Sequence, residues 1–129
     1  MTTTASRIAL APVYAVLPAE DLARARKFYH ETLGFEIDEM PGQFIFHAGG
    51  GTRVLVYERE RTRAEHTVAG FMVEDVPSMV SELRSLGVIF EDYDLPGLKT
   101  ENGVATTPVG RAAWFKDPEG NIIAISEMA

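Results

Sequence analysis

The sequence contains a diverged internal repeat, and this feature restricts the possible folds more than any other. Glu20-Asp21 recurs as Glu74-Asp75 after 54 residues, and Leu33-Gly34-Phe35 recurs as Leu86-Gly87-Val88 after 53 residues. Each copy is typical of a strand, a helix and three further strands. Two copies are too few to bury a solenoid core, so paired βαβββ modules account for the repeat better. We therefore predict an α+β fold in which the two modules form a curved mixed β-sheet.

The modules have clear expected limits along the 129 residues, a length that suits one domain of ordinary size. Residues 1–11 are expected to form an N-terminal arm and residues 12–129 a single domain. Module one is expected over about 12–60 and module two over about 67–127. The charged stretch between them has no periodicity, so a linker is predicted over 61–66.

Apolar spacing and turn residues predict the individual elements. Helices are expected over 22–33 and from Val76 onward, with Asp21 and Asp75 as their N-caps. Strands are expected over 12–17, 35–39, 43–48, 53–58, 67–73, 88–93, 111–115 and 121–127.

Residues 94–110 do not fit the minimal module. A connection of this length in a compact domain is usually a lid, a binding loop or a disordered segment. Because the stretch carries apolar residues among its prolines and glycines, we expect a loop that lies over the mouth of the module-two sheet. An excursion without a role is the alternative.

The last two strands flank the polar turn Asp117-Pro118-Glu119-Gly120, which predicts a β-hairpin. If the loop has four residues, strand alternation places Ala113 and Phe115 on the face of Ala124. A bulge would bring Trp114 to that face instead.

Three segments, LPAEDLARARKFYHETLGF, FMVEDVPSMVSELRSLGV and WFKDPEGNIIAI, resemble the vicinal oxygen chelate (VOC) superfamily, the glyoxalase/bleomycin resistance/dioxygenase group. The resemblance covers about residues 12–127. It implies a fold of paired βαβββ modules and a homodimer. It also implies, for the metal-dependent members, one divalent ion held on the concave face of the sheet by His or Glu from four strands.

The ligand positions that the resemblance implies hold unsuitable residues in this chain. They fall on Tyr14, on Leu55 or Val56, on Val68, and on Ala124, where the family usually carries a Glu. Aliphatic side chains offer no lone pair, and a site needs at least three good protein donors. We therefore expect no metal and no cofactor.

Histidines leave one metal alternative open. An atypical site could use His47 or His66, and His66 has the strand parity of the expected ligand position. A solvated or hydrogen-bonded histidine at a strand edge is the more common situation.

Apolar residues at the ligand positions predict a concave cavity that binds a small apolar or aromatic molecule. A core that simply fills this space is the alternative. A second class of function is a VOC-type enzyme, either a metal-independent lyase or isomerase that uses Tyr14, or a glyoxalase- or dioxygenase-like enzyme with an atypical metal site. The sequence assigns no catalytic residue. The residues expected to bind the ligand are Tyr14, Val56, Tyr57, Val68, Trp114, Phe115 and Ala124.

Composition excludes several other classes. The net charge of −7 without any basic stretch argues against a nucleic acid or an anionic membrane as partner. The chain has no cysteine, which excludes disulfides and thiolate metal sites. No apolar run approaches a membrane span, and the N-terminus lacks the apolar core of a signal peptide. A cytoplasmic location is therefore expected.

Overall fold

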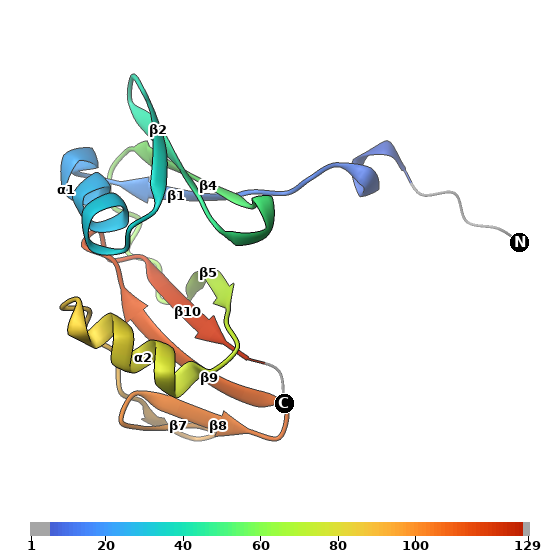
Figure 1. Ribbon diagram of the computed structural model, residues 1–129, viewed down its shortest axis with the longest axis vertical. Helices are drawn as coiled ribbons and strands as arrows, with labels where there is room; N and C mark the ends of the chain where they lie inside the picture. Colours follow the sequence, from blue (N-terminus) through green and yellow to red (C-terminus); the bar gives the residue numbers. More distant parts are fainter. Residues whose placement is uncertain (1–5, 128–129) are drawn as a thin grey trace, which may run out of the picture.

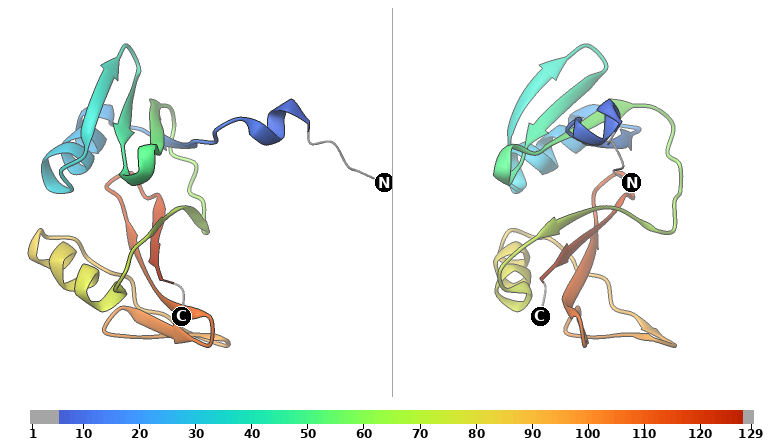
Figure 2. Two further views of the ribbon diagram at one scale, coloured as in Figure 1. Left: turned by 45° about the vertical axis from the view of Figure 1, so that its right-hand side comes forward. Right: turned by 90° about the vertical axis from the view of Figure 1, so that its right-hand side faces the viewer.

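The computed structural model describes residues 6–127 and consists of two β-sheets, each with a helix against one face (Figure 1). The α+β fold class predicted from the repeat is confirmed. The arm expected over 1–11 lies partly outside the described residues. Its described part includes a 3-10 helix, η1 (Arg7–Leu10), which stands away from both sheets and buries no side chain (Figures 1 and 2).

The first sheet has the strand order β1-β4-β3-β2, in which β1 and β4 run parallel and the other neighbours run antiparallel. Its helix begins as α1 (Leu22–Arg26) and continues as a π-helical segment, η2 (Lys27–Thr32), so the predicted helix is present but widened in its second half. The three glycines between β3 and β4 form a tight turn, η3 (Gly49–Gly51), in which Gly50 has φ 68°. The strands are β1 (Ala15–Ala19), β2 (Glu36–Met40), β3 (Gln43–His47) and β4 (Arg53–Glu58).

The second sheet has the order β5-β10-β9-β8-β7-β6, with β5 and β10 parallel. Its helix, α2 (Val76–Ser85), packs against β9. The parallel pair and the antiparallel strands beside it repeat the topology of the first sheet, as the internal repeat requires. The strands are β5 (Thr67–Met72), β6 (Asp94–Leu95), β7 (Leu98–Glu101), β8 (Val104–Thr107), β9 (Gly110–Lys116) and β10 (Ile122–Ser126).

Residues 88–110 differ from the prediction. The expected strand over 88–93 is reduced to one bridge, between Phe90 and Phe115, because β8 occupies the adjacent edge of β9. The expected loop over 94–110 is wrong: this stretch forms β6, β7 and β8, a meander that extends the sheet at its edge. Asn102 and Gly103 both have positive φ and close the two-residue turn between β7 and β8.

The final hairpin has a five-residue loop over 117–121, because Lys116 pairs with Ile122. Asp117 stabilises this longer loop with its Oδ1 atom, which accepts hydrogen bonds from the backbone N–H of Glu119 and of Asn121. One extra loop residue changes which side chains share a face, so the four-residue expectation is wrong.

The two helix N-termini are capped differently. Asp21 caps α1 as predicted, since its carboxylate accepts from the N–H of Arg24. Asp75 makes no such bond, and its carboxylate instead accepts from Arg111. The first N–H of α2 donates to Glu127 across 2.8 Å, so a residue from the far end of the module supplies this cap.

Aromatic contacts join the two modules into one continuous core. Phe35 in module one stacks on Phe71 in module two, with ring centroids 5.7 Å apart. The ring of Phe28 lies 6.2 Å from that of Phe115. Because helices and buried strand faces of both modules contribute to this cluster, each module completes the burial of the other.

Candidate functional site

We call the face of each sheet that points away from its helix the open face. In module one, Leu17 and Val56 form a parallel pair that is buried toward the helix. Strand alternation therefore places the next pair, Pro18 with Tyr57, on the open face.

In module two, Ala124 lies directly opposite Trp114 on the neighbouring antiparallel strand, and both are half-buried on the open face. On its other side Ala124 pairs with Gly70 of β5. The indole of Trp114 is supported by the ring of Tyr93, which meets it edge-on at 5.6 Å. The small residues Gly70 and Ala124 therefore lie beside the indole of Trp114, which packs on Tyr93.

The structure places Trp114 opposite Ala124 and separates other predicted binding residues from this pair. Phe115 and Val56 are each 1% exposed and belong to the core on the helix side, so the expectation that Phe115 shares the face of Ala124 is wrong. Val68 lies at the register shift in β5 and packs against that same core. Those on or beside the open face are Tyr14, Tyr57, Trp114 and Ala124.

Tyr14 just precedes β1 and is 58% exposed, and it shares the open side with Val16 two residues later. Met72 at the end of β5 is 76% exposed. Large apolar side chains are thus exposed to solvent along or beside β1 and β5, the edge strands that pair in parallel with β4 and β10. An uncovered apolar surface of this kind is typical of a binding face.

The residues at the family's metal positions do not fit a metal. Ala124, Leu55 and Val68 offer no donor atom, whatever Tyr14 contributes. Within residues 6–127 no group of three or more His, Asp or Glu side chains is arranged to hold an ion.

The histidines considered as replacements lie elsewhere. His47 pairs with Asp38 at 2.7 Å on the β2–β3 hairpin. His66 is exposed just before β5. Neither faces a second histidine or a cluster of carboxylates in the described part of the chain.

Sequence reasoning missed the role of the carboxylates in the final hairpin. Glu119 is 3% exposed, and its oxygens accept from the backbone N–H of Asp21 at 2.8 Å and from Arg24 Nε at 2.6 Å. Burial alone would raise the pKa of Glu119, but the Arg24 guanidinium and the backbone donor outweigh it and hold that pKa below its usual value. The module-two turn therefore caps the module-one helix (Figure 1).

Asp117 makes a second contact between the modules. Its Oδ2 atom accepts from the hydroxyl of the fully buried Tyr29 at 2.7 Å and from the side-chain amide of Asn121. Burial and the neighbouring Asp117 carboxylate raise the pKa of Tyr29 well above its usual value. These hairpin residues join the two modules through hydrogen bonds.

Comparisons with known proteins agree with this architecture. A family model described as the Glyoxalase/Bleomycin resistance protein/Dioxygenase superfamily matches residues 11–125. A comparison with curated protein sequences gives no match. No helix within residues 6–127 is both long enough and apolar enough to cross a membrane.

Solved structures share the fold at low sequence identity. TnmS3, an antibiotic binding protein from Streptomyces sp. CB03234, is 24% identical, with a TM-score of 0.68 over 92% of this chain and 98% of that one. Lactoylglutathione lyase from Agrobacterium tumefaciens is 23% identical, with a TM-score of 0.65 over 91% and 92%. The fosfomycin resistance protein FosX from Listeria monocytogenes is 15% identical, with a TM-score of 0.66 over 92% and 93%.

Proposed function

Because the chain belongs to the Glyoxalase/Bleomycin resistance protein/Dioxygenase superfamily, we propose that it is a metal-independent binding protein for a small apolar or aromatic molecule. The ligand lies on the open sheet face, beside Trp114. The observation that carries this proposal is the pairing of Ala124 with Trp114: a methyl group stands where the family usually has a metal-binding Glu, directly across from an indole ring.

The geometry around this pair suits a flat ligand. Gly70 and Ala124 leave a low area on the sheet surface, whereas Trp114 rises beside it. The edge-on contact with Tyr93 fixes the indole, so its orientation costs little entropy when a ring stacks on it. An aromatic ligand of this kind would gain stacking without requiring a buried charge.

A second copy of the chain is the partner that we propose. Tyr14, Val16 and Met72 are too exposed in one chain to enclose a ligand, and their burial against a second copy would exclude water from the open face. The apolar arm residues Ile8 and Leu10 are also exposed and available for the same contact. A homodimer and a cytoplasmic location both remain predictions.

An antibiotic-binding role is one specific form of this function. The similar fold of TnmS3, which is described as an antibiotic binding protein, supports it at the level of architecture. The enzyme alternative lacks a comparable observation. A metal-independent enzyme that uses Tyr14 would need an acid or base partner, and Lys99 lies on β7 opposite Asp94, in the other sheet.

Substitution of Ala124 by Glu tests the proposal. A carboxylate beside Trp114, in a place without donors, should abolish binding of apolar aromatic compounds in a thermal-shift screen while the protein stays folded. Ala23→Glu, the same change on the exposed surface of α1, should leave the hits unchanged. Identical hits for wild type and Ala124→Glu would contradict the proposed site. Stabilisation of Ala124→Glu by added zinc or manganese would show instead that the site still accepts a metal.

A further inference from the structure

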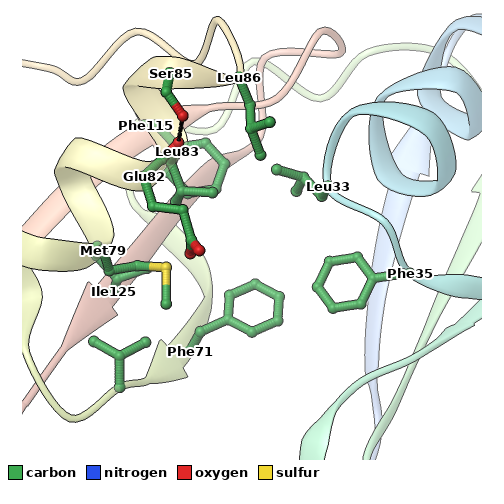
Figure 3. A pocket seen from close by; sticks show the side chains of 11 residues that line it. Leu33, Phe35, Phe71, Met79, Glu82, Leu83, Ser85, Leu86, Phe115 and Ile125 are labelled. Carbon is green, nitrogen blue, oxygen red and sulfur yellow. Dashed lines mark hydrogen bonds between the residues drawn. The ribbon is translucent and has the colours of Figure 1, made fainter.

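A cavity lies on the helix side of the sheets, on the opposite side from Ala124. It is a groove of roughly 570 Å³ between the two modules. Figure 3 shows Leu33 and Phe35 projecting into it from module one, with Phe71, Met79 and Leu86 facing them from module two. We call this the intermodule groove.

The intermodule groove has the size and surface of a small-molecule site. Its volume lies within the range that drug-sized ligands occupy, and aromatic, aliphatic and thioether groups line it. The stacked rings of Phe35 and Phe71 form its floor, where the modules meet. Leu86 on its rim is 49% exposed, so the groove is open to solvent.

Glu82 places a negative charge at the edge of this apolar surface. Its side chain extends from α2 toward the space between Met79 and Phe71 (Figure 3). An adjoining hollow shares Met79 and Glu82 with the groove and adds Glu74 to its lining. Among residues 6–127, no ion pair involves Glu74 or Glu82.

The negative charge of the whole chain also favours a cationic ligand. The net charge of −7 favours approach of cations and opposes anions. Two carboxylates that line the adjoining hollow, Asp75 and Glu127, are already paired with Arg111. A ligand that fills the intermodule groove therefore meets apolar side chains at one end and uncompensated carboxylates at the other.

From this arrangement we propose that the intermodule groove binds a lipophilic amine: an aromatic or aliphatic body that packs against Phe71 and Leu86, with a protonated amine near Glu82. This site is separate from the one on the open face. The intermodule groove is lined by α2 and by the strand residues Phe115 and Ile125. Ala124 and Trp114, on the same two strands, point to the opposite face.

A matched pair of probes tests the charge preference. 2-(2-Naphthyl)ethylamine and 2-naphthylacetate have the same ring system and opposite charges at pH 7. Calorimetric titration of the full chain should show tighter binding of the amine by up to about fivefold, the upper range for a solvent-exposed ion pair, and this preference should shrink in 0.5 M salt. Equal affinities at low salt would overturn the proposal.

Two pairs of variants locate the binding. Ser85→Trp places an indole in the groove and should weaken amine binding by about tenfold, whereas Ser81→Trp, on the same helix but outside the groove, should not. Glu82→Gln should lower the preference for the amine over the carboxylate, and Glu31→Gln, an exposed glutamate on the other helix, should not. Amine binding that survives Ser85→Trp would overturn the proposal.

Two further measurements distinguish the intermodule groove from the open-face site and from a dimer contact. In NMR spectra of the wild type, the amine should shift amide signals of residues 33–35, 71–73 and 79–86. Ala124→Glu should bind the amine as the wild type does, so failure of the open-face site leaves this result unaffected. If a second copy covers the groove instead, the proposal is wrong: the amine will not bind, and Ser85→Trp will shift the sedimentation coefficient toward the monomer.

Discussion

Glu119, near the end of the chain, contacts an element near its beginning. It is almost fully buried, and it accepts hydrogen bonds from the N-terminus of α1 and from Arg24. A helix N-terminus stabilises a nearby carboxylate, because unpaired backbone N–H groups and the helix dipole both favour negative charge there. The two modules are thus joined by a charge-assisted contact in addition to apolar packing.

Glu119→Gln is expected to lower the free energy of unfolding by about 1 kcal/mol at pH 7. The amide oxygen can still accept from Asp21, but the charge-assisted part of the contact is lost, and the half-exposed Arg24 adds little. Chemical denaturation measures the difference. Glu31→Gln, at an exposed position, should change stability by much less.

The same variant has a defined pH dependence. Because the pKa of Glu119 is lower in the folded state than in the unfolded chain, its contribution is complete above about pH 4.3 and is lost as the pH falls through the folded value. The stability difference between wild type and Glu119→Gln should therefore shrink below about pH 4. A difference that stays constant down to pH 3 would contradict this role.

At the scale of elements, the meander of β6, β7 and β8 replaces the loop that the sequence was expected to form. Three two-residue turns connect these short strands and β9. Asn102-Gly103 is a strong hairpin signal in sequence, and attention to it would have predicted the β7–β8 pair. No turn signal of this kind corrects the prediction for residues 88–93. Their composition is typical of a strand, but they make only one bridge to β9, and β8 pairs with β9 beside them.

Thr100 anchors this meander, since its buried hydroxyl accepts from the N–H of Tyr93 and donates to Asp92. Thr100→Val keeps the shape but leaves the Tyr93 N–H without this acceptor, so we expect a loss of about 1–2 kcal/mol. Denaturation and amide exchange at Tyr93 measure the effect. Thr106→Val, on the exposed side of β8, is the control and should be close to neutral. Unchanged exchange at Tyr93 in Thr100→Val would show that the meander does not depend on this bond.

At the scale of the whole molecule, the buried apolar residues of the two modules form one continuous core. Phe71 packs on Phe35, Phe115 on Phe28, and the module-two turn caps α1. Removal of one module therefore exposes aromatic surface that the other buries.

The isolated fragment 66–129 is accordingly expected to be unfolded. One sheet face and one helix bury too little apolar surface to offset the conformational entropy of ordering the chain. Circular dichroism should show no cooperative thermal transition in the fragment, whereas the full chain should show one under the same conditions. A cooperative transition in the fragment would mean that module two is an independent folding unit.

The sequence by itself determined the pattern of elements. The offset of 53 to 54 residues, the apolar spacing of the helices, the Asp21 cap and the glycine at the end of each helix are all local signals. They predicted two modules in which a strand and a helix precede three further strands; the first module has this order, whereas five strands follow α2 in the second. The residues at the ligand positions that the resemblance implies, among them Ala124 and Val68, are likewise read directly from the sequence.

Only the tertiary structure decided which side chains meet. A single extra residue in the 117–121 loop moved Trp114 to the face of Ala124 and Phe115 to the opposite one, since strand side chains alternate with period two. The same alternation buries Val56 against the helix. The caps from Glu119 and Glu127, and the groove between Phe35, Phe71 and Leu86, join residues far apart in the chain. Local propensity carries no information about such contacts, because they depend on how two whole modules pack against each other.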